Sequence, residues 1–275
     1  MSETATVSAL FYYPLKSTRG IATSVARLAP TGIEWDRQWM VVDAAQRFLS
    51  QRTHPHMARI VPQVADGVLT LTHPDLPELR VPEATGGAAL TVRIWDDSCE
   101  ALPQAAAADE WLSRALGEPV RLVRARVGMR AANVAYAGRT PSPIGFPDGY
   151  PLLICSAGSL ADLNRRLPEA IPMERFRPNL VLEGLPPWAE DRIATLTAGE
   201  VTLRLVKPCT RCAIPTLDHR TGAPAVNVLK TLKTFRFDRT LHGVTFGVNA
   251  VIERGGSGGQ LRRGEPVAVA FRAAS

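Results

Sequence analysis

The sequence predicts a β-rich α+β fold, built as a partly antiparallel barrel or sandwich. Short runs rich in Val, Ile, Leu and aromatic residues dominate the chain, and most are bounded by Gly, Pro, Asp or Thr. These runs follow one another too closely for regular βαβ units, which need a helix between successive parallel strands. Few segments have helical spacing, so helices are expected to be a minor component.

Nine of these runs are expected to be strands, because each combines high β-propensity with turn residues at its ends. The expected strands are Val7–Tyr13, Trp39–Asp43, Val68–Thr72, Leu90–Trp95, Val120–Val123, Asn179–Glu183, Val201–Val206, Val244–Ile252 and Val267–Phe271.

Three segments are expected to be helices. They are Ala105–Leu116, Ser159–Leu167 and Val226–Phe235. Gly117 follows the first in the position of a C′ residue. The second opens with Ser159 and Asp162 at the spacing of a capping box, with Asp in place of Glu. The third carries apolar residues at helical spacing. A domain boundary is expected after the first helix, dividing the chain into residues 1–118 and 119–275.

The bulk composition is typical of a soluble globular protein. With 275 residues, 45% of them hydrophobic, the chain can bury one large core or two small ones. The start of the chain lacks a basic region and Lys16 interrupts its apolar stretch, which argues against a secretory signal. No run of about 18 apolar residues occurs, so no membrane span is expected. The four cysteines are then expected to be thiols in the cytoplasm.

The basic charge balance leaves two classes of partner open. The formal net charge is +6, and Arg accounts for all but four of the 32 basic residues. Together with abundant Ala, this Arg bias indicates a GC-rich bacterial genome. Nucleic-acid binding is not expected, because no basic run of about five or six residues and no aromatic-basic platform occurs. An anionic small ligand explains the charge at least as well.

A Cys-x-x-Cys pair, Cys209 and Cys212, has several interpretations. A zinc knuckle needs two further ligands, and the remaining candidates are Cys99, Cys155 and five scattered His. Zinc is therefore not expected. A thioredoxin-like dithiol needs its cysteines at a helix N-terminus, and Pro215 disfavours a helix there.

Two interpretations of the pair remain. One is a single soft thiolate on a loop after a strand, which suits a thiophilic metal. The other is two buried cysteines without a role, since buried Cys is common. Lys207 and Arg211 weaken the second interpretation, because cations lower a thiol pKa and are poor core residues.

Seven further features, in order along the chain, match one known family. They are Tyr12–Ser17, Asp36–Val42, Phe146–Pro151, Ser159–Asn164, Phe176–Asn179, Cys209–Cys212 with Leu217–Asp218, and Phe246–Asn249. The chain resembles MOSC-domain proteins of the mitochondrial amidoxime-reducing-component type and their bacterial relatives. MOSC denotes the domain at the C-terminus of molybdenum cofactor sulfurases. The resemblance implies a MOSC-type β-barrel preceded by a smaller N-terminal β-rich domain.

The resemblance also implies a molybdenum cofactor site. The second cysteine of the family's Cys-x-Arg-Cys segment is the protein ligand to molybdenum, which assigns the metal to Cys212 and leaves Cys209 without a task. The family's cofactor contacts fall on Lys16, Ser17, Arg37, Gly149, Tyr150, Arg177, Asn179, Thr210, Arg211 and Asn249. The anionic pterin phosphate needs charge-assisted donors, which cations from three distant segments would supply. Pro215 and Leu217 stand where the family often has Thr and Val, so the pocket wall is expected to differ.

The implied reaction is two-electron reduction of an N-hydroxylated compound, a hydroxylamine or an amidoxime: R–NHOH, two protons and two electrons give R–NH₂ and water. Asp148 is the nearest family-matched acid, and we expect it to carry protons or orient substrate. Gly149, which follows it, permits an unusual backbone angle. No Cys follows Cys212, so no iron–sulfur cluster is expected and a separate ferredoxin-like partner or flavin reductase would supply electrons. Two alternatives stay open: a persulfide carrier using Cys212 or Cys209, and a carrier or storage protein for the cofactor.

Overall fold

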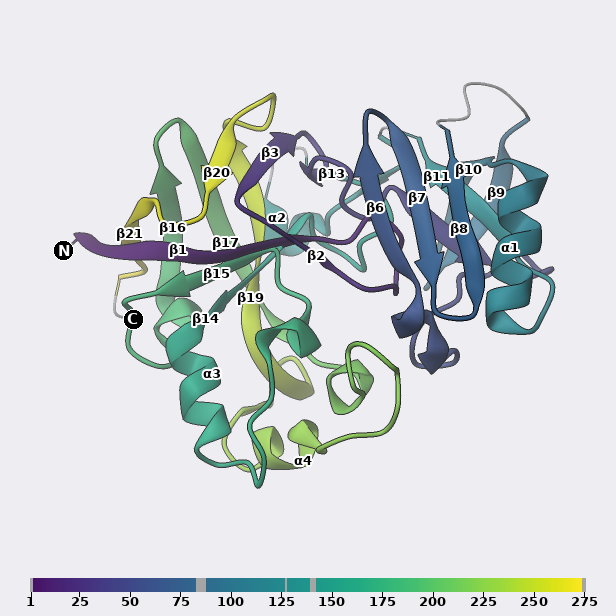
Figure 1. The fold of residues 1–275 in the computed structure, drawn as a ribbon. Helices are drawn as coiled ribbons and strands as arrows, with labels where there is room; N and C mark the ends of the chain where they lie inside the picture. The colour runs from purple at the N-terminus through teal and green to yellow at the C-terminus, as the bar shows by residue number, and fades with distance from the viewer. Residues whose placement is uncertain (1, 83–87, 127, 139–141, 274–275) are drawn as a thin grey trace.

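A closed barrel of seven strands forms the larger part of the molecule (Figure 1). The computed structural model describes residues 2–82, 88–126, 128–138 and 142–273. Around the ring the strands are β14 (Leu152–Ser156), β15 (Leu180–Glu183), β1 (Ser2–Tyr12), β21 (Pro266–Phe271), β16 (Ile193–Ala198), β17 (Val201–Thr210) and β19 (Gly243–Arg254). Strand β19 pairs again with β14 and closes the ring. Only β14 and β15 run parallel; the other neighbours in the ring are antiparallel.

The first strand of the chain belongs to this barrel. Strand β1 lies between β15 and β21, so the N-terminus is hydrogen-bonded to strands from the second half of the sequence. The domain division after residue 118 stays a prediction, and the barrel itself takes strands from both sides of it.

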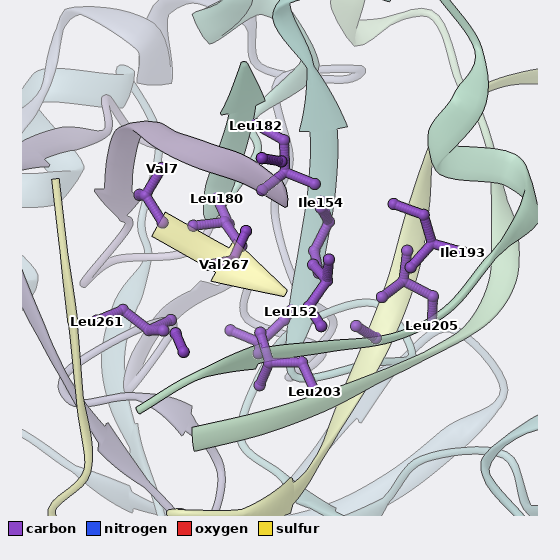
Figure 2. Packing of buried hydrophobic residues seen from close by; sticks show 14 of the residues in the cluster. Val7, Leu152, Ile154, Leu180, Leu182, Ile193, Leu203, Leu205, Leu261 and Val267 are labelled. Atoms are coloured by element: carbon purple, nitrogen blue, oxygen red, sulfur yellow. The ribbon is translucent and has the colours of Figure 1, made fainter. Parts of the chain in front are cut away.

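Alternating apolar residues fill the barrel. Along β17, Val201, Leu203 and Leu205 are buried while the residues between them are partly exposed, and Val267 and Val269 repeat this alternation in β21. Successive side chains of a strand point to opposite faces, so one set of each strand packs in the interior. Figure 2 shows Leu203, Leu205 and Val267 within this cluster.

A second lobe lies beside the barrel (Figure 1). It contains a four-stranded sheet of β5 (Trp39–Val42), β11 (Arg121–Ala125), β10 (Asp97–Pro103) and β9 (Leu90–Ile94), a three-stranded sheet of β6 (Val61–Ala65), β7 (Val68–His73) and β8 (Leu76–Val81), and helix α1 (Ala106–Leu116). Trp39 and Trp111 are buried in its core, and the Trp111 indole N–H donates to the carbonyl of Pro77 at 2.7 Å.

Short elements complete the structure. They are β2 (Ile21–Thr23), β3 (Val25–Ala29), β4 (Gly32–Ile33), β12 (Arg130–Ala131), β13 (Pro143–Ile144), β18 (Phe237–Asp238), β20 (Gln260–Arg262), α2 (Val134–Ala137), α3 (Ala157–Asn164) and α4 (Val228–Lys233), with 3-10 turns at Pro55–Arg59, Met173–Phe176, Ala189–Arg192 and Ile214–Thr216. None of the helices in the described ranges has the length and apolarity needed to cross a membrane.

The expected fold class is confirmed, with one helix cap wrong. All nine expected strands occur, and α1 ends at Gly117 in the left-handed conformation, with φ of 77°. Helix α3 begins after Ser156, whose hydroxyl accepts from the N–H of Gly158, so Ser159 is not the cap. Ser159 is buried inside the helix, where its hydroxyl donates to Glu190 at 2.7 Å. This long-range contact, not local capping, determines the position of Ser159.

Candidate functional site

One cavity of about 390 Å³ collects all the residues expected to form the site. These are Lys16, Ser17, Arg37, Asp148, Gly149, Tyr150, Arg177, Asn179, Thr210, Arg211, Cys212 and Asn249. They come from the segment after β1, the turn before β5, the loop before β14, the turn before β15, the end of β17 and the middle of β19. The barrel thus brings distant parts of the chain to one wall, and the second lobe closes the other side.

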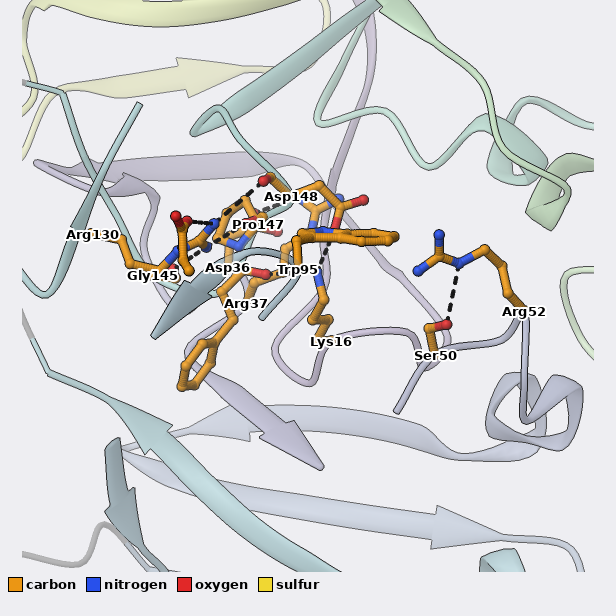
Figure 3. Close-up of polar contacts among 12 residues, drawn as sticks. Lys16, Asp36, Arg37, Ser50, Arg52, Trp95, Arg130, Gly145, Pro147 and Asp148 are labelled. Carbon is orange, nitrogen blue, oxygen red and sulfur yellow. Dashed lines mark hydrogen bonds and ion pairs between the residues drawn. The ribbon is translucent and has the colours of Figure 1, made fainter. Parts of the chain in front are cut away.

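A buried lysine pairs with a carboxylate at the cavity mouth. Lys16 is 6% exposed, and its ammonium donates to the Phe146 carbonyl at 2.8 Å and to Asp148 Oδ1 at 2.5 Å. The same carboxylate oxygen accepts the indole N–H of Trp95 at 3.0 Å (Figure 3). The Asp148 side chain is 69% exposed, so its second oxygen is open to a ligand. Because an ammonium has three donors, Lys16 keeps one that these two bonds do not use.

The surroundings of Lys16 and Asp148 shift the pKa of each group. Burial lowers the pKa of Lys16, while the Asp148 carboxylate opposes that shift. Crowding by protein atoms raises the pKa of Asp148, but the Lys16 charge and the hydrogen bonds from Lys16 and Trp95 outweigh it and hold this pKa well below its usual range. Asp148 is therefore ionised at neutral pH. Both expected roles of Asp148, carrying protons and orienting substrate, stay predictions.

Two arginines stack on one buried tyrosine. The guanidinium carbons of Arg37 and Arg177 lie 4.3 and 4.2 Å from the ring centroid of Tyr13, which is 1% exposed. The Tyr13 hydroxyl donates to the carbonyl of Pro178 at 2.9 Å. Cation–π contacts of this kind hold planar guanidiniums in place and leave their N–H edges free for other partners.

The two arginines differ in their other contacts. Arg37 pairs with the buried Asp36 and donates to Asn179 Oδ1 at 3.1 Å. Arg177 donates to the Thr18 carbonyl at 2.6 Å and makes no ion pair within the described ranges. Burial lowers the pKa of Arg177 to about 10, so it remains cationic at neutral pH.

Counting charges predicts an anionic ligand. Three cations, Lys16, Arg37 and Arg177, face two carboxylates. Asp148 pairs with Lys16, and Asp36 pairs with Arg37. The cluster keeps a net positive charge in a partly buried place, which an anion would offset.

Several of these residues have an unusual backbone conformation. Ser17, Arg37 and Arg177 have φ of 66°, 48° and 55°, in the left-handed region that non-glycine residues rarely adopt. Such positions cost on the order of 1–3 kcal/mol each and cluster at ligand sites. By contrast Gly149 does not have a positive φ, and a Cβ built on it would meet nothing within 4 Å. Gly149 therefore does not use the backbone freedom that a glycine permits.

The Cys-Thr-Arg-Cys segment lies at the end of a strand. Cys209 is the half-buried penultimate residue of β17, and Cys212 lies beyond the strand end with its side chain exposed to the cavity. Arg211 donates to Cys209 Sγ at 3.0 Å and to the Phe176 carbonyl at 2.8 Å. Burial opposes its charge, but the thiols of Cys209, Cys155 and Cys212 outweigh that and raise the pKa of Arg211. The guanidinium is thus placed to stabilise negative charge on these sulfurs.

This geometry decides between the interpretations of the pair. Neither cysteine begins a helix of a thioredoxin-like site, because a strand precedes them and a three-residue 3-10 turn follows. The exposed Cys212 also contradicts the interpretation of two buried cysteines. In the described part of the chain no group of three or more His, Cys, Asp or Glu could hold a metal ion.

Two polar atoms in the cavity wall have no partner among the described residues. They are the hydroxyl oxygen of Tyr150 and Nε of Arg211, both buried. Buried polar groups are almost always hydrogen-bonded, so such atoms at a cavity indicate contacts with a ligand. Asn179 is instead satisfied within the protein, since it accepts from Leu153 N and donates to the Phe11 carbonyl. Asn249 donates to the Lys207 carbonyl, and Thr210 is exposed at the cavity edge.

Sequence reasoning missed the contribution of the second lobe. Trp95 and Arg52 line the cavity, and Arg52 stacks on Trp95 with 3.9 Å between Cζ and the ring centroid. Arg130 is buried, pairs with Asp97 and donates to the carbonyls of Gly145 and Pro147, which fixes the loop that carries Asp148 (Figure 3). A Trp followed by two Asp after a strand is typical of an ordinary turn, so the local sequence does not indicate that these residues belong to a site.

Comparison with known proteins assigns the family. Residues 4–119 match the MOSC N-terminal beta barrel domain, and residues 141–268 match the MOSC domain. The chain is 31% identical to mitochondrial amidoxime-reducing component 1 of Homo sapiens and 30% identical to that of Mus musculus, over 97% of this chain and 83% of each relative. Mitochondrial amidoxime reducing component 2 of Homo sapiens is 30% identical over 97% of this chain and 84% of its own. With both domains matched and this similarity spanning nearly its whole length, the chain belongs to the MOSC-domain family that includes the amidoxime-reducing components.

Proposed function

We propose that the protein is a molybdenum-cofactor-dependent reductase of N-hydroxylated compounds. The observation that carries the proposal is one cavity that holds an exposed thiol, Cys212, together with a net cationic cluster around Tyr13. A soft thiolate suits a thiophilic metal, and the cations suit the phosphate of a pterin cofactor. The names of the relatives, which describe amidoxime reduction, support the choice of substrate class.

The residues of the cavity fit this cofactor. Cys212 would hold the metal, while Arg37 and Arg177 would hold the phosphate with their free N–H groups. The unpartnered Tyr150 hydroxyl and Arg211 Nε offer two further polar contacts for the pterin. When bound, the cofactor would supply the two-electron reduction that no side chain can perform.

The protein's own groups would orient the substrate and supply a proton. The open oxygen of the ionised Asp148 can accept a hydrogen bond from the N–H or O–H of an N-hydroxylated substrate. Lys16 holds that carboxylate in place and, with its pKa lowered by burial, is the acid of the pair. Loss of the hydroxyl as water needs one proton on the departing oxygen, and the ammonium of Lys16 would supply it.

A separate protein would supply the electrons. The net charge of +6 favours docking of an acidic ferredoxin-like or flavin-containing partner, most strongly at low salt. We propose that the chain acts in the cytoplasm, where such reductases are available.

A sulfur carrier is the second candidate, because an exposed Cys212 with Arg211 beside it would also suit a persulfide. Turnover by the purified chain separates the two. A reductase should reduce amidoximes with a reduced viologen as donor and should not use NADH alone. A protein that holds cyanide-labile sulfur and no molybdenum, and reduces nothing, is a sulfur carrier instead.

A further inference from the structure

A second cavity adjoins the first across a shared wall. Its volume is about 750 Å³, and Phe48, Ser50, Arg52 and Trp95 line both cavities. The rest of its wall also comes from the second lobe. These four residues therefore form the boundary between the cavity of Cys212 and a chamber that the cofactor contacts proposed above do not use.

Arg52 on this boundary has unused hydrogen-bonding capacity. Its guanidinium stacks on the Trp95 ring, with Cζ 3.9 Å from the centroid (Figure 3). The one hydrogen bond of its side chain among the described residues, from Nε to Ser50 Oγ, is 3.4 Å long and therefore weak. Arg52 pairs with no carboxylate in the ranges that the structure describes. Its terminal N–H groups are thus available to an acceptor in either cavity.

Two of the three carboxylates around the second cavity already have a basic partner. Asp43 pairs with Arg47 at 3.0 Å, and Glu118 lies 2.5 Å from Nε2 of His54. The side chains of Asp43 and Glu118 are thus engaged by Arg47 and His54 and not by Arg52.

Two arginines of the second cavity, Arg52 and Arg93, form no ion pair among the described residues. Of these two, Arg52 is the one that reaches the boundary with the first cavity. A planar guanidinium with free N–H groups is the side chain best suited to bind a carboxylate through two parallel hydrogen bonds.

Trp95 contacts both Arg52 and Asp148. Its indole N–H binds Asp148, and its ring face carries Arg52. Asp148 and Arg52 therefore contact the same indole, Asp148 at its N–H edge and Arg52 over its face. Trp95 also has a positive φ of 57°, so the backbone is held in a rare conformation to present this ring.

We propose that the second cavity is the subsite for the part of the substrate remote from its N–O bond, and that Arg52 selects N-hydroxylated substrates bearing a carboxylate. The inference rests on the proposed reductase function. A flat substrate would lie beside Trp95, with its N-hydroxyl group at Asp148 and its carboxylate at Arg52.

Binding of unreactive amides to the cofactor-loaded protein tests the proposal without turnover. Calorimetry would compare 4-carbamoylbenzoate with neutral benzamide, for the wild type and for Arg52→Gln. We expect the wild type to prefer the carboxylate, and Arg52→Gln to reduce that preference about tenfold, as for loss of one charge-assisted hydrogen bond. Arg93→Gln is the matched control, since Arg93 is an unpaired cation of the same cavity that lies off the boundary. It should keep the preference. Equal loss in both variants, or no loss in Arg52→Gln, would overturn the proposal.

Turnover with the corresponding amidoximes separates this inference from the function itself. The ratio of kcat/KM for 4-carboxybenzamidoxime to that for benzamidoxime should fall in Arg52→Gln by the same factor, through KM. If the wild type reduces neither compound, the reductase function fails, whatever the calorimetry gives. If the wild type reduces benzamidoxime but Arg52→Gln leaves the ratio unchanged, the function stands and the role of Arg52 is wrong.

Discussion

Lys16 and Asp148, 132 positions apart in the sequence, form an ion pair of 2.5 Å at the wall of the cavity. Trp95, from the second lobe, donates to the same carboxylate oxygen. Three separate segments therefore meet at one carboxylate, and two donors keep it ionised. In the proposed reaction the pair would divide two tasks that a single acid would otherwise combine: Asp148 would accept a hydrogen bond from the substrate, and Lys16 would give a proton.

Replacement of Asp148 by Asn should lower turnover without emptying the site. An amide cannot neutralise the buried Lys16, and it accepts a weaker hydrogen bond than a carboxylate. We expect Asp148→Asn to keep its molybdenum and to lose roughly 10²-fold in kcat per bound metal, a typical effect of disturbed acid–base groups. The measurement is turnover per molybdenum across pH. Glu100→Gln is the control, because Glu100 forms only an exposed pair with Arg126.

Two outcomes would contradict the role of Asp148. Turnover at the wild-type rate per metal would make Asp148 a turn residue. Loss of molybdenum would instead assign it to support of the cofactor loop.

The cationic cluster should hold the cofactor. Lys16→Ala, Arg37→Ala and Arg177→Ala should each lower cofactor content, because each removes a charge-assisted contact worth about 1.5–3 kcal/mol. Cofactor retained after dialysis would be measured for each variant, with Arg59→Ala as control, since Arg59 pairs with Asp75 at the surface. Full retention in all three variants would place the phosphate elsewhere.

Glu190 should make stability depend on pH. It is fully buried, and burial raises its pKa from 4.5 to about 7 despite the Ser159 hydrogen bond. The folded state then binds more protons than the unfolded state between these values, so the free energy of unfolding falls as pH rises through this window. At about 1.36 kcal/mol for each pKa unit, the loss is at most roughly 3 kcal/mol.

Removing the charge of Glu190 tests this dependence. Glu190→Gln keeps an acceptor for Ser159 and cannot ionise, so its stability relative to the wild type should rise as pH increases from about 5 to about 8. Denaturant unfolding at both pH values measures it. A difference between the two proteins that does not change with pH would show that Glu190 does not titrate in this range.

The fold was largely predictable because its strands have strong local signals. Strands β17 and β19 carry long apolar runs, and α1 ends at a glycine whose left-handed conformation suits that position. The start of α3 was not predictable, because Ser156 and Ser159 are both good caps. Contact of Ser159 with a buried carboxylate 31 positions away decides between them, and no local pattern contains that contact.

The candidate site was also predictable only in part. Its cysteine segment and its cations are found by family resemblance, because they form compact motifs. Trp95 and Arg52 are not, because their roles depend on how the second lobe lies against the barrel: Trp95 reaches Asp148 across 53 positions. The sandwich of Tyr13 between Arg37 and Arg177 is also a product of tertiary structure.

Metal analysis of three proteins tests the central claim most directly. Wild type, Cys212→Ser and Cys209→Ser would be purified from a host that makes molybdenum cofactor, and metals would be counted per folded chain. Both cysteines line the cavity, but Cys212 is exposed whereas Cys209 is half-buried beside Arg211. We predict about one molybdenum per chain in the wild type, near-complete loss in Cys212→Ser and retention in Cys209→Ser, as for a single thiolate ligand. Zinc in place of molybdenum, or equal loss from the two variants, would contradict the account.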